Sequence, residues 1–186
     1  MQTVAERFVS VDIEASGPVP STYSMLAIGA CLVSDPERGF SAELQPVTMA
    51  STPQALSVSG LSLERLAAEG LPPEQAMAEF AAWLDQEVTD GPAVFIGFNA
   101  AFDWMFVSEY FHRYLGRNPF GHAALDIKSY FMGAFGTRWD QTWFGNIAQQ
   151  VGGPAELTHD ALHDAQDQAR LFAALLAHGA RVPRED

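Results

Sequence analysis

The sequence predicts an α/β fold built on one mixed five-stranded sheet with helices on both faces. Three strand-like segments separated by turns occupy residues 8–47, which indicates an antiparallel meander. Two further short apolar segments are each followed by helical periodicity, which is typical of parallel strands with helical connections. At 186 residues with 48% hydrophobic content, the chain is expected to form a single domain over 1–186, with a frayed tail from about residue 181.

The first strand is expected over residues 8–14, where apolar and polar side chains alternate with a period of two. The alternation puts Asp12 and Glu14 on one face, close together at the carboxyl end of the strand. Two carboxylates held together repel each other and are costly to desolvate. A Mg²⁺ or Mn²⁺ ion would remove that cost, since hard oxygen ligands suit both. The alternative interpretation is a strand that runs out into an acidic, solvated turn at 15–18.

The other strands follow from apolar runs bounded by turn residues. The continuous apolar run at 25–33 predicts a buried second strand, and Asp-Pro-Glu-Arg-Gly at 35–39 predicts the turn after it. Alternation over 40–47 predicts the third strand. Short apolar segments at 93–97 and 123–126 predict two more, which lie between helical segments.

Helices are predicted where apolar residues recur at helical spacing. Pro72-Pro73 opens one of them, with Met77, Phe80 and Leu84 along its core side, and Gly179 fits a C-terminal cap for the last. The predicted helices cover 62–69, a segment from 73 onward, 102–115, 127–135, 142–151 and 161–178.

Two further acidic motifs lie at expected helix starts. Asp103 falls in the first turn of the helix after strand 93–97, where the helix dipole favours an anion, and Asn99 precedes it. Near the last helix, Asp160 is a plausible N-cap, with His159 just outside the helix and Asp164 one turn inside. His159 and Asp164 can therefore converge on one point. Taken singly, each motif also fits ordinary helix-start chemistry.

Together the motifs resemble a known family. Asp12-x-Glu14, then Asp103, then His159-x₄-Asp164 occur in the order found in the DEDDh subgroup of 3′–5′ exonucleases, whose members include polymerase proofreading subunits, oligoribonuclease and RNase T. The h subgroup is indicated by His159, because the y subgroup would have a tyrosine at the position of Asp160. The stretch 58–62 is similar to the family's His-Gly-Ile-Thr-like segment, and the resemblance extends from about residue 8 to residue 176. Ala-Ser-Gly at 15–17 departs from the usual Thr-Thr-Gly.

The resemblance implies a ribonuclease H-like fold and a metal-dependent 3′–5′ exonuclease that releases nucleoside 5′-monophosphates from single-stranded DNA or RNA. Asp12, Glu14 and Asp164 would then hold one Mg²⁺ or Mn²⁺ ion, which binds the attacking water. Asp12 would bridge to a second ion supported by Asp103 through water, with the two ions roughly 3.5–4 Å apart. His159 would be the general base.

Residues that contact the substrate are less well defined by the sequence. Phe102 and Met25 are expected to line a pocket for the terminal base, and Asn99 is a further candidate for substrate contact. Basic residues interleaved with aromatic ones between 113 and 144 suit a single strand, with bases stacked and phosphates neutralised. This set is Arg113, Arg117, Lys128, Phe131, Phe135, Arg138, Trp139, Trp143 and Phe144, of which Trp143 and Phe144 are slightly better explained as core residues of the helix at 142–151. Solvent-facing, capping or unassigned roles are expected for His112, His122, Asp126, Asp160, His163, Asp167 and His178.

Composition limits the partners. A net charge of −13, from ten basic and 23 acidic residues, argues against gripping a long duplex and favours short or single-stranded nucleic acid. The chain has one cysteine, Cys31, and no apolar run long enough for a membrane span, so no membrane partner and a cytoplasmic location are expected. A homodimer is expected because such dimers are frequent in the resembled family.

Three alternatives stay open. The first is an oligoribonuclease or RNA-trimming exoribonuclease, with short substrates favoured by the acidic surface. The second is a nucleic-acid-binding domain of the same fold without catalysis, although all five motif residues are present. An acidic nuclease of ribonuclease H-like fold that cuts internally is the third.

Overall fold

The structure, a computed structural model, describes residues 6–153 and 157–179. Its centre is a five-stranded sheet of order β3-β2-β1-β4-β5. Strands β1 (Arg7–Ala15), β2 (Met25–Leu32) and β3 (Asp35–Glu43) form an antiparallel meander. Strands β4 (Ala93–Gly97) and β5 (Ala124–Asp126) run parallel to β1. The predicted mixed sheet is confirmed, and the tail expected from residue 181 lies outside the described residues.

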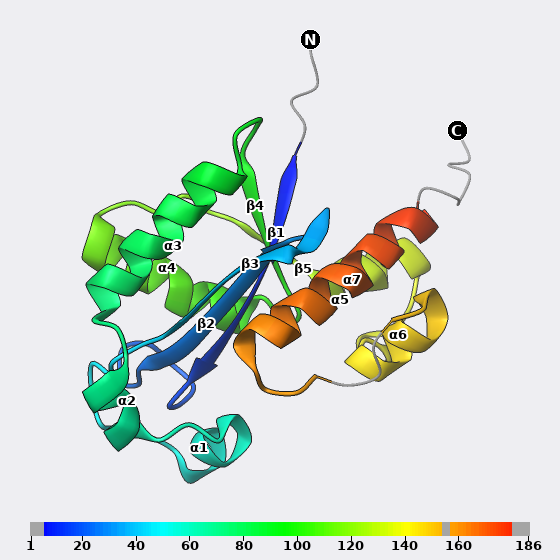
Figure 1. The fold of residues 1–186 in the computed structure, drawn as a ribbon. Coiled ribbons are helices and arrows are strands. Elements are labelled where there is room, and N and C mark those ends of the chain that lie inside the picture. The colour runs from blue at the N-terminus through cyan, green and yellow to red at the C-terminus, as the bar shows by residue number, and fades with distance from the viewer. Residues whose placement is uncertain (1–5, 154–156, 180–186) are drawn as a thin grey trace.

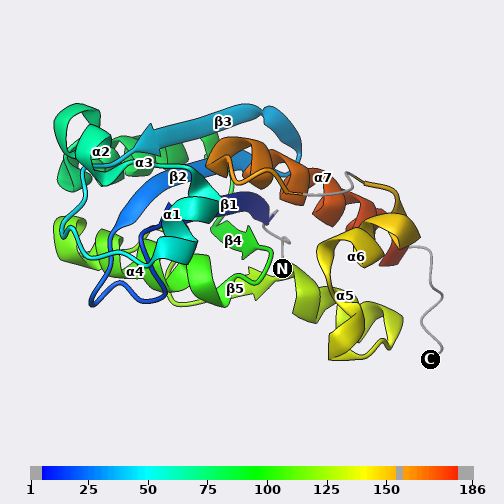
Figure 2. The same cartoon turned by 90° about the horizontal axis from the view of Figure 1, so that it is seen from below.

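Helices cover both faces of this sheet, as predicted (Figures 1 and 2). None of the helices within the described residues is long and apolar enough to cross a membrane. The helical elements are α1 (Pro53–Ser59), α2 (Leu63–Glu69), α3 (Pro73–Glu87), α4 (Ala101–Leu115), α5 (Ile127–Phe135), the 3₁₀ turn η1 (Trp139–Gln141), α6 (Phe144–Val151) and α7 (Ala161–Gly179).

Two hydrophobic cores, one on each face, account for the sequence pattern of the strands. On one face, Val9, Val11 and Ile13 pack in a core with residues of α3 and α4. The other face of β1 and β2 is covered by α7, next to which α5 and α6 lie. All eight residues of β2 are buried, because this strand is covered on both faces, and this explains its continuous apolar run.

The structure corrects three predicted boundaries. Residues 35–39 are the beginning of β3 rather than a turn, and β3 ends at Glu43 rather than at residue 47. As the outer strand of the sheet, β3 tolerates Pro36 and Gly39, which would disfavour a central strand.

Two helices also differ from the prediction. Helix α1 lies at 53–59, where no helix was predicted, and α6 begins at Phe144 rather than at residue 142. The start of α1 had a local signal, since Thr52 caps it and proline occupies its first turn.

Candidate active site

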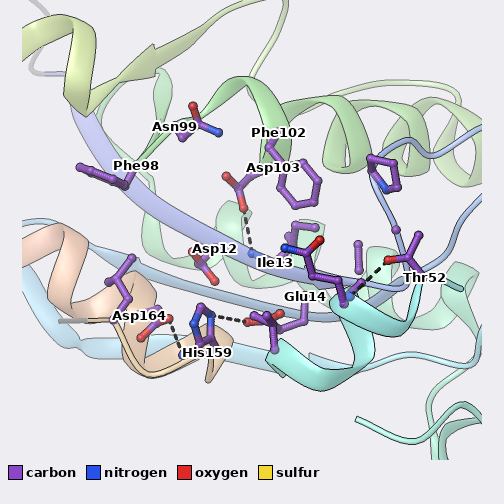
Figure 3. Close-up of a pocket in the computed structure, with 17 residues that line it drawn as sticks. Asp12, Ile13, Glu14, Thr52, Phe98, Asn99, Phe102, Asp103, His159 and Asp164 are labelled. Carbon is purple, nitrogen blue, oxygen red and sulfur yellow. Dashed lines mark hydrogen bonds and ion pairs between the residues drawn. The ribbon is translucent and has the colours of Figure 1, made fainter. Parts of the chain in front are cut away.

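Five predicted residues line one cavity of about 510 Å³ at the carboxyl end of β1 (Figure 3). Asp12 and Glu14 extend from β1 itself. Asp103 lies in the first turn of α4, which follows β4. His159 and Asp164 come from the loop before α7 and from its first turn. The three separate motifs are therefore brought together in space.

The backbone of β1 holds Asp103 in place. The last residue pair between β1 and β4 is Ser10–Ile96, so β1 continues beyond the end of its parallel neighbour. There the amide of Ile13 donates a 3.0 Å hydrogen bond to Oδ1 of Asp103. Only 4% of Asp103 is exposed. The longer strand thus supplies the donor that orients this carboxylate toward the cavity.

Asp164 fixes the loop that carries His159. Its Oδ1 accepts hydrogen bonds from the amide of Thr158 at 2.7 Å and from the Thr158 hydroxyl at 2.9 Å. Its Oδ2 accepts one from the amide of His159 at 2.8 Å. His159 has a φ of 62°, a conformation uncommon for a residue other than glycine. The buried carboxylate therefore stabilises a backbone conformation that points His159 at the site.

A glycine lets the start of α7 approach the sheet. Gly29 on β2 is paired with Asp12 on β1. A Cβ at Gly29 would lie 2.2 Å from the carbonyl carbon of Ala161, the first residue of α7. Any side chain at this position would have to displace the helix start. The absence of a side chain thus allows His159 and Asp164 to lie beside the β1 carboxylates.

Gln168, which the sequence analysis missed, connects two parts of the site. Its side chain is fully buried, and its Nε2 donates a 2.6 Å hydrogen bond to Oδ1 of Asp12. Its Oε1 accepts a 2.8 Å hydrogen bond from the amide of Phe98, just after β4. The sequence contained a pattern that could have indicated this residue. Position 168 lies four residues after Asp164 and therefore on the same face of the last helix.

Burial, together with electrostatic repulsion within the cluster, raises the carboxylate pKa values. Burial raises the pKa of Asp12 well above its usual range, and the charges of Asp103, Asp164 and Glu14 raise it further. Burial, with Asp164, raises the pKa of Glu14 to about 7. Burial, followed by Glu14 among its neighbours, raises the pKa of Asp103 to about 8, against the lowering effect of the Ile13 amide. Carboxylates so arranged would retain protons at neutral pH unless cations compensate them, so the donor set fits hard divalent ions.

His159 lies at the rim of the cluster. Its side chain is 52% exposed, and its Nδ1 lies 4.0 Å from Oε1 of Glu14. Ligand atoms of Glu14, His159 and Asp164 all lie within 4.8 Å of one another. The imidazole therefore contacts both the carboxylate cluster and solvent, an arrangement suited to exchanging a proton with a water molecule in the site.

The predicted substrate residues differ in their positions. Phe102 and Asn99 line the cavity, and Asn99 has a positive φ of 63°. Met25 does not line it: its side chain is fully buried in the core, and its amide donates to the Tyr110 hydroxyl. The prediction for Met25 is therefore wrong, because this residue lies on a strand that is covered on both faces.

The remaining polar candidates have structural contacts. Asp160 accepts from the amide of His163, and Asp126 caps α5 through the amide of Ser129, as expected. Asp126 also accepts a 2.9 Å hydrogen bond from the amide of Ala100. Asp167, expected to face solvent or cap the helix, is instead 6% exposed and paired with Arg170.

Comparison with known proteins agrees with this geometry. A model of the RNase T family, described as an exonuclease, matches residues 9–172. An Escherichia coli protein named 3′–5′ DNA exonuclease Cap18 is 51% identical over 173 residues, which are 92% of this chain and 92% of that protein.

Solved structures share the fold at low identity. The nuclease domain of 3′hExo, described as a DEDDh family member bound to rAMP, is 14% identical, with a TM-score of 0.78 over 100% of this chain and 99% of that one. Escherichia coli ExoI in complex with single-stranded DNA is 16% identical, with a TM-score of 0.71 over 95% of this chain and 41% of that one. S. pombe Pop2p with Mg²⁺ and Mn²⁺ bound is 17% identical, with a TM-score of 0.64 over 95% of this chain and 86% of that one.

Proposed function

Because this chain belongs to the RNase T exonuclease family and is a 3′–5′ exonuclease, we propose that it removes nucleotides one at a time from the 3′ end of single-stranded DNA, releasing nucleoside 5′-monophosphates. The observation that carries this proposal is the convergence of Asp12, Glu14, Asp103, His159 and Asp164 around one cavity. The preference for DNA is supported by the 51% identity to a protein named as a DNA exonuclease.

The carboxylates would hold the metal. Asp12, Glu14 and Asp164 are proposed as ligands of one Mg²⁺ or Mn²⁺ ion, and Asp12 with Asp103 as the residues serving a second. Four carboxylates balance the charge of two divalent ions, and bound cations would relieve the mutual repulsion that contributes to the raised pKa values of the cluster. When bound, such ions act as Lewis acids that activate water and stabilise charge on the phosphate and the leaving oxygen.

The side chains around the metal ligands would do the remaining work. His159 is proposed as the general base, since histidine ordinarily changes protonation near neutral pH and this side chain is open to solvent for proton release. Gln168 would keep Asp12 oriented. Phe102 and Asn99, on the α4 side of the cavity, would contact the 3′-terminal nucleotide.

A ladder assay tests the proposal. We would incubate 5′-labelled single-stranded DNA, duplex DNA and RNA of matched sequence with Mg²⁺, Mn²⁺ or chelator. The expected result is metal-dependent shortening of single-stranded DNA in single-nucleotide steps, with mononucleotide products. Preference for RNA of a few nucleotides would instead identify an RNA-trimming enzyme. Internal fragments, or binding without any cleavage, would contradict the proposal.

Two expectations about the whole protein stay predictions. A homodimer would give twice the monomer mass in light scattering coupled to gel filtration, and a monomeric mass would contradict it. A cytoplasmic location is tested by cell fractionation with an antibody against the native protein, and enzyme in the membrane or extracellular fraction would contradict that expectation.

A further inference from the structure

We propose that Lys128, Trp139 and Trp143 form a second nucleotide-binding surface beside the active-site cavity. This surface, the Lys128 platform, would hold the nucleotides on the 5′ side of the bond being hydrolysed. The inference rests on the proposed function, because it assigns a path to the strand whose 3′ end occupies the cavity.

The first argument is charge. Lys128 is the single lysine of the chain. Within residues 6–153 and 157–179, each of the seven arginines lies within 4.0 Å of a carboxylate, whereas Lys128 does not. Arg113 and Arg117, predicted to grip the strand, are paired with Glu109 and Asp85. Lys128 is therefore the cation in the described part of this acidic protein best able to meet a phosphate.

The second argument is the aromatic surroundings of that cation. The Lys128 ammonium lies 4.3 Å from the centre of the Trp139 ring and 5.7 Å from that of Phe98. Phe98 lines the active-site cavity, so the Lys128 ammonium lies between a ring of the cavity wall and Trp139. Trp139 is 55% exposed, and Trp143, at the start of α6 four residues later, is 58% exposed rather than buried in the core as the sequence favoured. An exposed indole ring beside a cation, with a second exposed indole nearby in the chain, is a combination that binds single strands through base stacking and phosphate contact.

The third argument is that the Lys128 platform is held in place. Asp126 caps α5 two residues before Lys128 and also accepts the amide of Ala100, so the start of α5 is tied to the start of α4. The Trp139 carbonyl accepts the hydroxyl of Thr142 at 2.8 Å, which fixes the turn before α6. Phe144, which the sequence favoured as a core residue, is buried and packs edge-on against Phe98.

The layout of the cavity gives the direction of the strand. Phe98 lies at one end of the row of site residues and Thr52, next to α1, at the other, with the carboxylates between them (Figure 3). The phosphate to be hydrolysed must lie at the carboxylates. Because Lys128 lies on the Phe98 side, the rest of the strand would leave there, where the Lys128 platform begins. The 3′-terminal nucleotide would then occupy the opposite end, lined by α1 and Phe102.

Two substrates of different length separate the Lys128 platform from the catalytic site. Thymidine 5′-monophosphate p-nitrophenyl ester is a single nucleotide that reports on the cavity alone, whereas oligothymidylates of increasing length also reach the platform. We expect the Trp139→Ala/Trp143→Ala double variant to hydrolyse the ester as wild type does. Its KM for an octanucleotide should rise roughly 5- to 150-fold, the range measured for stacking one base on an aromatic side chain. Trp139→Phe/Trp143→Phe, which retains rings, should restore most of the loss.

Lys128 has its own readout. We expect Lys128→Gln to weaken octanucleotide binding and to reduce the slope of log Kd against log salt concentration by about 0.7, the value for one lost contact with a single-strand phosphate. Lys128→Arg should retain the slope. Arg117→Ala is the matched control, because it also removes one positive charge, but from an exposed side chain already paired with Asp85. Binding is followed by quenching of tryptophan fluorescence in an Asp103→Asn background, which prevents turnover.

The outcomes distinguish the two proposals. If wild type shortens oligonucleotides and the Lys128 platform variants do so with unchanged KM and salt slope, the platform inference is wrong and the exonuclease proposal stands. If wild type cleaves neither substrate, the proposed function fails. The fluorescence titration then still decides whether Trp139, Trp143 and Lys128 bind a single strand.

Discussion

At the scale of single residues, Gln168 shows how a neutral side chain supports an acidic site. Its side-chain amide donates a hydrogen bond to Asp12 and accepts one from the backbone just after β4, and it thereby orients the Asp12 carboxylate. The pKa of Asp12 is raised by burial and by repulsion from neighbouring carboxylates. The hydrogen bond from Gln168 to Asp12 lowers the pKa of that group and so opposes the effect of burial. Residues that orient metal ligands affect metal affinity almost as strongly as the ligands themselves.

We therefore expect Gln168→Met, which keeps the volume but removes both hydrogen bonds, to raise the Mg²⁺ concentration needed for half-maximal activity by roughly 10- to 100-fold. The measurement is a metal titration of nucleotide release. Gln166→Met is the control, because Gln166 lies on the same helix but donates to the Pro36 carbonyl. An equal metal requirement in the two variants would show that Gln168 has no role in orienting Asp12.

The catalytic roles of His159 and Asp103 can be tested in the same way. We expect His159→Ala and Asp103→Asn each to lower kcat by roughly 10²- to 10⁴-fold, because each removes a group proposed to act on the reacting atoms or their metal. Circular dichroism should show an unchanged fold. His112→Ala, an exposed histidine on α4, serves as control and should retain full activity. Turnover close to wild type in either site variant would remove that residue from the mechanism.

At the scale of secondary-structure elements, the site depends on how α7 meets the sheet. Gly29 brings the backbone of Ala161 against β2, and Asp164 then holds the preceding loop by three hydrogen bonds. The position of His159 is thus set by a helix–strand contact and by a strained loop together. A small displacement of the helix would separate the two halves of the carboxylate cluster.

We expect Gly29→Ala to lower the free energy of unfolding by about 1–3 kcal/mol, as overpacking does, and to reduce activity further than the loss of stability explains. Gly133→Ala is the matched control. Gly133 lies within α5, and a Cβ there would meet no described atom within 4 Å. It should stabilise the protein by about 0.5–1 kcal/mol. Chemical denaturation and nucleotide release would be measured on both, and normal stability and activity of Gly29→Ala would contradict the role of this contact.

At the scale of the whole molecule, the acidic surplus includes the carboxylate cluster that is proposed to hold metal ions. The chain carries a net charge of −13, and the described arginines are paired with carboxylates. An acidic surface with few free cations cannot bind nucleic acid by charge alone. On the proposed function, affinity for a strand would therefore come from metal ions in the cavity and from a few aromatic and cationic groups. This is a reason to expect weak duplex binding.

The charge cluster also predicts a pH-dependent stability. Glu14 and Asp103 have folded-state pKa values of about 7 and about 8, above those of the unfolded chain. Between the unfolded and folded pKa values the native state binds more protons, so the free energy of unfolding of the chelated protein should fall as pH rises from 5 to 8. Divalent metal should reverse this loss, and should raise the melting temperature more at pH 8 than at pH 5.

Differential scanning fluorimetry with chelator, Mg²⁺ or Mn²⁺ measures both effects. The Glu14→Gln/Asp103→Asn double variant is the control, because its site lacks the two titrating groups. It should show a flatter pH dependence and a smaller shift with metal. A chelated wild-type protein whose stability rises from pH 5 to pH 8, or does not respond to metal, would contradict this account of the cluster.

The fold class and the five motif residues followed from the sequence because they depend on local patterns. Period-two alternation placed Asp12 and Glu14 on one face of a strand. Helix-start positions explained Asp103 and Asp164, and the order of the motifs identified the family. Such features depend on residues close together in the sequence, so they can be predicted without knowing how the elements pack.

Other features were decided by tertiary structure alone. Met25 is buried because β2 is covered on both faces, and Pro36 lies in a strand because β3 is the outer strand of the sheet. Gln168 and Lys128 contact residues that are far away in the sequence. Gln168 donates a hydrogen bond to Asp12, which is 156 positions earlier in the chain. The Lys128 ammonium lies over the ring of Phe98, just after β4. Periodicity determines which side of an element a residue occupies. Only the packing of elements determines what lies opposite, and therefore which polar group orients a ligand and which cation is left for the substrate.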